Sequence, residues 1–249
     1  EIVARENGLY AQIKIDEGDN LGPARIRIRS LLAAMREKMA QKSRGKMEDM
    51  PPAPIFTEAM RDTHTILIPQ MSPIHFRFME TILAVDGYKA VQLPSVDKEA
   101  IDLGLRYVNN DACFPAIVVV GQLLQAVRNG PYDHHKVALA VTQTGGGCRA
   151  TNYIAFLRKA LLDCGLDHVP IVAFSTNVNA DAPGFRVSGK MLRRLIMAGH
   201  YGDALMRMLY RVRPYELEPG SAERLAERWI EKAKNNIVSG NVLRFEWNM

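Results

Sequence analysis

Short apolar runs alternate with longer helical segments from residue 65 onward, and this alternation constrains the fold more than any other feature. The runs are Thr65–Pro69, Lys89–Leu93, Val137–Val141 and Pro170–Phe174. Strands that are apolar at nearly every residue are typical of a parallel sheet buried on both faces. We therefore predict an α/β fold built on a four-stranded parallel sheet.

The segments between and after these runs have helical length and spacing. They cover residues 73–85, 98–108, 115–127, 151–164, 188–211 and 221–235. Strands that alternate with helices in this way place helices on both faces of the sheet. The last two segments are predicted to form a C-terminal helical extension.

The N-terminal part of the chain is less regular. Residues 1–20 alternate weakly, which predicts a short strand or a piece of a hairpin. A helix is expected from Pro23 to about Gln41, because proline suits the first turn of a helix. Three regions result: an N-terminal segment with a proline-rich linker (1–54), an α/β core (55–185) and the C-terminal extension (186–249). Since the chain opens without methionine, we interpret it as a fragment of a longer protein.

The charge balance limits the classes of partner. The net charge is +5 and the isoelectric point is near 9.1, with moderate basic clusters at 25–29, 42–46 and 186–194. Such clusters indicate a solvated surface, or attraction to an anionic ligand such as coenzyme A or to an acidic partner domain. Only 7% of residues are aromatic, and none alternates with basic residues as in nucleic-acid platforms, so no nucleic-acid partner is expected.

Composition also bears on the compartment. No apolar run approaches the ~20 residues that span a bilayer, and the first residues lack the pattern of a signal peptide, so no membrane association is expected. Three cysteines are an odd number and too few for a disulfide scaffold. We expect a protein of the reducing cytoplasm.

Two of the cysteines lie where a loop gives way to a predicted helix. Cys113 follows Asn-Asn-Asp-Ala, and Cys148 follows three glycines. The positive end of a helix dipole favours the thiolate, which is the form that ligates metals or acts as a nucleophile. Cys164 differs, because it lies on one helical stripe with Leu157 and Leu161 and is expected to pack in the core.

Cys148 has the stronger local argument. It follows a predicted strand, which places it at the carboxyl edge of a parallel sheet, where α/β proteins build their sites. Gly145, Gly146 and Gly147 permit close approach of a bulky group to backbone amides, although the loop lacks the pattern of a phosphate loop. The alternative is that these glycines form a tight turn and Cys148 packs inside.

Cys113 is flanked by Asp111, a candidate N-cap, and by Pro115, a candidate first-turn residue. Its thiol would then lie beside free amide donors. The alternative is an ordinary buried cysteine.

The histidines give weaker signals. His75 follows the first strand and is a candidate ligand or proton donor at the same edge, or else a surface histidine. His134 and His135 lie in a turn and are expected to be solvated. The sequence contains no His-Glu-x-x-His, Cys-x-x-Cys or Gly-x-Ser-x-Gly pattern, so zinc-protease, zinc-ribbon and serine-hydrolase functions have no support.

Two thiolates are compatible with part of an iron–sulfur site, which normally needs three or four cysteines. The missing ligands could come from a second copy of the chain, from a preceding segment, or from water or substrate at an open iron. The two cysteines could instead form a redox dithiol. Zinc fits less well, since structural zinc sites are usually closed by four ligands.

Several stretches resemble the 2-hydroxyacyl-CoA dehydratase activator-related family of bacterial proteins. These stretches are Asn109–Ala116, Val119–Gln122, Thr142–Tyr153, Tyr201–Arg207 and Arg213–Glu216. The resemblance covers most of residues 22–220 and is most specific at Gly-Gly-Gly-Cys-Arg-Ala-Thr-Asn-Tyr. Members look like large fusions in which activase domains precede a dehydratase-like part, and this chain is similar to that C-terminal part.

The resemblance implies a redox function. In such proteins cysteines hold a cluster of the 4Fe–4S type, which receives electrons from an ATP-driven activase, so Cys113 and Cys148 become ligand candidates. Backbone amides of Gly145–Gly147 would bond to the cluster, Arg149 would place positive charge near it or near an anionic substrate such as an acyl-CoA, and His75 would deliver protons. No third ligand is implied.

The alternative is a scaffold that kept the fold, has no cluster and binds a catalytic partner.

Overall fold

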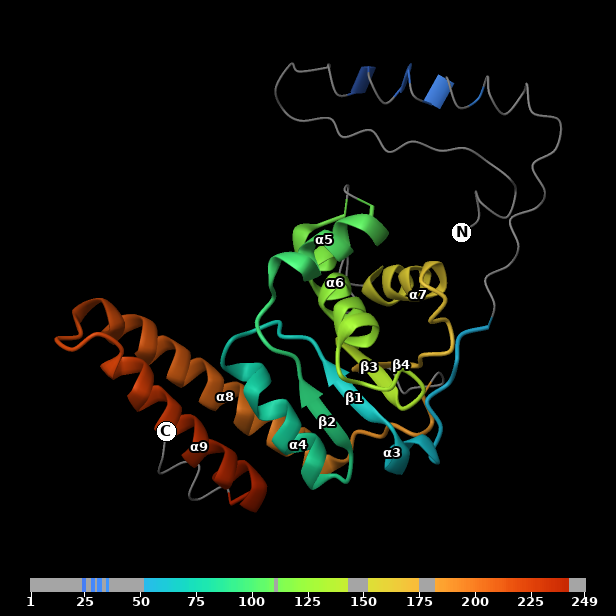
Figure 1. Ribbon diagram of the computed structural model, residues 1–249. Helices are drawn as coiled ribbons and strands as arrows, with labels where there is room; N and C mark the ends of the chain where they lie inside the picture. Colours follow the sequence, from blue (N-terminus) through green and yellow to red (C-terminus); the bar gives the residue numbers. More distant parts are fainter. Residues whose placement is uncertain are drawn as a thin grey trace. The chain divides into compact units, whose positions relative to one another are not determined.

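A computed structural model of the chain describes residues 52–109, 112–142, 152–174 and 182–241, together with 24–25, 28–29, 31–32 and 35 (Figure 1). The chain divides into two compact units, Glu1–Pro52 and Ala53–Met249. The described residues between 24 and 35 are helical, in agreement with the helix expected after Pro23. The predicted strand in residues 1–20, and the linker before Pro52, lie outside the described residues.

The second unit is built on a four-stranded parallel sheet (Figure 1). Its strands are β1 (Thr65–Ile68), β2 (Lys89–Gln92), β3 (Val137–Thr142) and β4 (Ile171–Phe174), in the order β2-β1-β3-β4. Thr65 pairs with Lys89 on one side and with Val137 on the other, and Leu139 pairs with Ile171. The predicted α/β fold with four parallel strands is confirmed.

Strand side chains alternate between two separate hydrophobic cores, because successive residues of a strand point to opposite faces. Ile66 and Ile68 of β1 belong to the first core, whereas Leu67 belongs to the second. In β3, Ala138 and Ala140 face the first core and Leu139 faces the second. The sheet is therefore covered on both faces, as its apolar strands predict.

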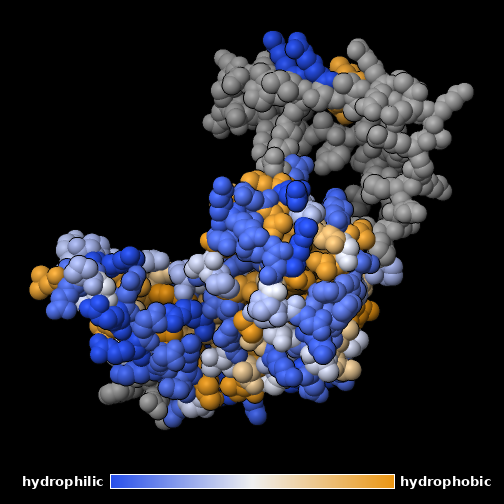
Figure 2. Space-filling view, viewed as in Figure 1, coloured by the Kyte–Doolittle hydropathy of each residue, from blue (hydrophilic) through white to orange (hydrophobic). Residues whose placement is uncertain are grey.

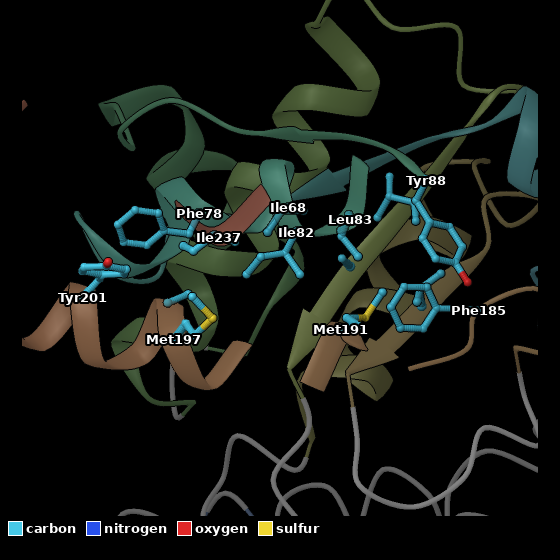
Figure 3. Close-up of a cluster of buried hydrophobic side chains, with 14 of the residues drawn as sticks. Ile68, Phe78, Ile82, Leu83, Tyr88, Phe185, Met191, Met197, Tyr201 and Ile237 are labelled. Atoms are coloured by element: carbon cyan, nitrogen blue, oxygen red, sulfur yellow. The ribbon is translucent and has the colours of Figure 1, made fainter. Parts of the chain in front are cut away.

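The first core is closed by the 3₁₀ turn η1 (His75–Phe78) and by the helices α4 (Met79–Val85), α8 (Gly189–Val212) and α9 (Ser221–Ser239). Figure 3 shows Phe78, Ile82 and Met191 of this core converging from different elements. The segment 73–85, predicted as one helix, thus begins with a 3₁₀ turn. A further short helix, α3 (Met60–Thr63), precedes β1 and was not predicted.

Helix α9 packs on α8 through small side chains. Its buried residues repeat at helical spacing, which is the pattern of an amphipathic helix. They are Ala222, Ala226, Ile230, Ala233, Asn236 and Ile237. On the face seen in Figure 2, the surface of α8 and α9 is largely hydrophilic. Arg194 of α8 is buried and donates hydrogen bonds to the carbonyls of Ile237 (3.0 Å) and Val238 (3.3 Å), which places a cation at the C-terminal end of α9.

The second core is closed by α6 (Phe114–Asn129) and α7 (Tyr153–Asp163), and α5 (Lys98–Tyr107) packs against α6. The contact between α5 and α6 depends on two glycines. A Cβ at Gly121 would lie 1.9 Å from the Ala100 carbonyl oxygen, and a Cβ at Gly104 would lie 2.1 Å from that of Ile117. The two backbones therefore approach more closely than any larger residue allows. Within the described ranges, no helix is both long and apolar enough to cross a membrane.

We expect Gly121→Ala to lower the free energy of unfolding by about 3 kcal/mol, the upper end of the usual cost of overpacking. The added methyl group would meet backbone rather than a movable side chain, so α5 must shift away from α6. Chemical denaturation measures this change.

The matched control is Gly189→Ala, at the first residue of α8, where a Cβ meets nothing within 4 Å. It should be neutral or should stabilise the protein by up to about 1 kcal/mol. Equal effects of the two substitutions would contradict the close contact between α5 and α6.

Candidate functional site

The strand order creates a switch point at the carboxyl edge of the sheet, between β1 and β3. The chain leaves β1 toward β2 on one side and returns to β3 on the other side. Connections that diverge in this way leave a crevice at the carboxyl ends of the strands, where open α/β sheets bind their ligands. The starts of α6 and α7 reach the same edge, because each helix runs antiparallel to the strand it neighbours in sequence.

A buried glutamine holds two loops together at this edge. The Gln122 side chain of α6 accepts a hydrogen bond from the Gln70 backbone N–H (2.9 Å), just after β1. It also donates to the Pro94 carbonyl (2.5 Å), just after β2. Gln122 is only 4% exposed and has both an acceptor and a donor partner. The Val119–Gln122 stretch thus combines the close helix contact at Gly121 with this link between loops.

Cys113 lies at the start of α6 and is itself the N-cap residue, with extended backbone angles. Asp111, the expected cap, lies outside the described residues, and Pro115 occupies the first turn as predicted. The Cys113 thiol is half-buried, and its Sγ lies 3.8 Å from the Tyr153 hydroxyl oxygen, within hydrogen-bonding distance for sulfur. The neighbouring Phe114 is 59% exposed, so an apolar surface adjoins the thiol.

The contact between Cys113 and Tyr153 joins two stretches that are 40 residues apart in sequence. Tyr153 is buried and is the first residue of α7, five residues after Cys148. Thr142, which ends β3, precedes the same segment, and its hydroxyl donates to the Met71 sulfur (3.6 Å) across the switch point. Thr142 and Tyr153, which flank the segment that contains Gly145–Gly147 and Cys148, therefore both lie at the carboxyl edge.

The remaining predicted residues of this segment cannot be placed. Cys148, Arg149 and the three glycines Gly145, Gly146 and Gly147 all lie outside the described residues. Their roles stay predictions.

Cys164 is remote from this site. It caps the C-terminal end of α7, and its partly buried side chain packs against the second core. The eleven residues of α7 separate it from Tyr153 by about 16 Å at the usual helical rise. Cys164 therefore packs against the core, as expected, and cannot share a compact metal cluster with Cys113.

His75 lies in η1 and contacts the helices that close the first core. Cys113, by contrast, packs against the second core. Its Nδ1 is 2.9 Å from the Ser72 hydroxyl, and its Nε2 is 2.9 Å from a carboxylate oxygen of Asp203 on α8. The ring lies against Gly202, where an added Cβ would be 2.3 Å from its Cδ2 atom. Both ring nitrogens are thus engaged in joining η1 to α8.

Two further motif stretches have structural roles. The Tyr201 hydroxyl donates to the buried Asn236 side chain (2.8 Å), which connects α8 to α9. The Glu216 carboxylate accepts hydrogen bonds from the backbone N–H groups of Gly220 (2.6 Å) and Ala222 (3.0 Å) at the start of α9. These two bonds, that of Gly220 first, lower the pKa of Glu216 below its ordinary value.

A histidine cluster lies at the opposite, amino edge of the sheet. His134 and His135 precede β3, and His168 precedes β4. One ring nitrogen from each of the three lies within 4.8 Å of the other two. His135 is exposed and His134 is partly exposed, as expected for solvated histidines. The sequence did not predict that both rings also pack against His168. Residues that precede neighbouring parallel strands meet at one edge, and this rule applied to the sequence would have found the cluster.

Comparison of the chain with protein-family models, with curated proteins and with solved structures finds no match.

We expect Gly202→Ala to lower the free energy of unfolding by about 1–2 kcal/mol, because the new methyl group displaces the His75 ring from Ser72 and Asp203. A double-mutant cycle isolates this effect, since in a His75→Ala background the methyl group meets no ring. Denaturation of the four proteins measures the cycle.

Gly199→Ala is the matched control on the same helix, where a Cβ meets nothing within 4 Å. It should be neutral or slightly stabilising in either background. If Gly202→Ala costs the same with and without His75, the ring is not what the glycine accommodates.

Proposed function

We propose that this chain is the iron–sulfur redox module of a 2-hydroxyacyl-CoA dehydratase/activase-type system. It takes low-potential electrons from an ATP-dependent activase domain or subunit and passes them to a small substrate such as an acyl-CoA. Cys113 and Cys148 ligate a cluster of the 4Fe–4S type at the carboxyl edge of the sheet.

The observation that carries this proposal is the contact between Cys113 and Tyr153 at the switch point. Sequence alone gives two cysteines on separate segments. The contact brings the first of them against the helix that follows the second, at the edge where α/β sheets bind ligands. Only four residues of chain lie between Cys148 and Tyr153.

The donor chemistry fits an iron–sulfur group in part. The Cys113 thiol is half-buried at the start of α6, and cysteine sulfur is the ligand that iron–sulfur clusters use. Since Cys164 lies at the far end of α7, this chain offers two thiols to the site. The other ligands would come from a second copy of the chain, a preceding segment, or solvent and substrate at an open iron.

The bound group would supply one-electron transfer, and the chain's own residues would hold and tune it. Cys113 holds iron, and a hydrogen bond from the Tyr153 hydroxyl to its sulfur is a means of setting the potential. Backbone amides of Gly145–Gly147 would bond to the sulfides, and Arg149 would balance negative charge on the cluster or substrate. His75 is the proposed proton source, although Ser72 and Asp203 already engage its ring.

Anaerobic reconstitution with iron and sulfide tests the proposal. The wild-type protein should develop a visible charge-transfer band, and Cys113→Ser or Cys148→Ser should reduce it at least tenfold, because each substitution removes a thiolate ligand.

Cys164→Ser is the matched control, since its thiol lies about 16 Å from the site along α7, and it should retain the full band. A band of equal strength in the Cys113→Ser/Cys148→Ser double variant would contradict ligation by these residues. Absence of iron in the wild type, with binding to an activase partner unchanged in the double variant, would favour the scaffold function instead.

A further inference from the structure

The amino edge of the sheet brings three imidazoles together from two separate loops. His134 and His135 lie in the turn before β3, and His168 lies between α7 and β4. β3 and β4 are adjacent and parallel, so the residues that precede them emerge side by side. Neither the carboxyl-edge site nor the contacts of the two cores involve these rings.

The three rings are in mutual contact. The Nδ1 atom of His134 lies 2.9 Å from the Nε2 atom of His168. The His135 ring stacks on that of His168 with centroids 4.7 Å apart, and its centroid is 4.2 Å from that of His134. If one ring nitrogen is taken from each residue, the three nitrogens all lie within 4.8 Å of one another.

We propose that His134, His135 and His168 form a binding site for one divalent transition-metal ion of the zinc class, with solvent at the fourth position. Imidazole nitrogens bind Zn²⁺ at about 2.0–2.1 Å, so two nitrogens on one tetrahedral ion are about 3.4 Å apart. The observed separations, from 2.9 Å between His134 Nδ1 and His168 Nε2 to at most 4.8 Å within the set of three, lie on both sides of this value. Three protein ligands and an open position are the pattern of zinc sites that exchange solvent.

The donor set selects the class of metal. Three neutral imidazoles suit zinc, copper, nickel or iron, whereas calcium and magnesium require oxygen ligands. The nearby carboxylates of Asp133 and Asp167 interact electrostatically with the imidazoles, so they would offset the charge of a bound cation.

The loops that carry the histidines are held by backbone hydrogen bonds. The Asp133 carboxylate accepts from the His135 N–H (3.0 Å), and the Asp133 carbonyl accepts from the Lys136 N–H (2.8 Å). The Lys136 carbonyl in turn accepts from Thr65 at the start of β1 (2.8 Å). These bonds fix the turn that carries His134 and His135 to the sheet, and ligands positioned before the metal arrives favour binding.

This site is independent of the proposed redox site. It lies at the amino edge, whereas Cys113 lies at the carboxyl edge, and no residue belongs to both. A bound ion would hold the loops before β3 and β4 together and would therefore stabilise the folded state.

The test is a titration of chelator-treated, full-length chain with Zn²⁺, followed by calorimetry and by metal analysis after desalting. The wild type should bind one equivalent, and its melting temperature should rise with zinc and fall again with chelator. His168→Ala should weaken binding at least about 100-fold, because even partners outside the ligand shell commonly contribute 10- to 100-fold.

His135→Ala gives a second variant that removes a ligand from an exposed position, so its folding does not depend on core packing. It should show the same loss of zinc binding. His200→Ala, on the exposed surface of α8, is the control that keeps full binding.

Cobalt substitution adds a spectroscopic outcome, since ligation by His134, His135 and His168 should give the absorption of tetrahedral cobalt in the wild type and in Cys113→Ser alike. Absence of stoichiometric binding by the wild type would overturn the proposal and leave a hydrogen-bonded histidine stack. Equal binding by His168→Ala and His135→Ala would overturn it as well.

Discussion

Burial of the sheet on both faces is the constraint on which the rest of the structure depends. Ile66, Leu67 and Ile68 of the central strand β1 are each at most 1% exposed, although they point alternately into different cores. Full burial of one such side chain stabilises the fold by about 1.5–3 kcal/mol. Because apolar side chains cover both faces, the candidate functional groups of the sheet lie at its two edges.

The two edges carry different chemistry. At the carboxyl edge, Cys113 contacts Tyr153 next to the switch point, and Gln122 joins the loops that follow β1 and β2. At the amino edge, imidazoles gather at the starts of β3 and β4. A thiol site and an imidazole site on opposite edges can bind different metals without sharing a ligand, so each proposal stands or fails alone.

Much of the fold could be predicted from the sequence, because strands such as Val137–Val141 are apolar throughout and glycines or prolines bound the helices. Strand order and the glycine contact at Gly121 could not, since they depend on packing between distant segments. The role of His75 also escaped prediction, because its partner Asp203 lies 128 residues away. Cys113 was located correctly at a helix start, but local pattern favoured Asp111 as the cap. For Cys148, the sequence still supplies the only argument.

The proposed iron–sulfur group at the carboxyl edge depends on Cys113 and Cys148. Its decisive test is the iron and acid-labile sulfide content of the full-length polypeptide, purified without oxygen. We expect iron and sulfide in about equal amounts, as in a 4Fe–4S cluster, and we expect any bound zinc to be lost separately when His168 is substituted. Protein that contains no iron would contradict this expectation. So would iron that is present without sulfide and that disappears when His168, rather than Cys113, is substituted.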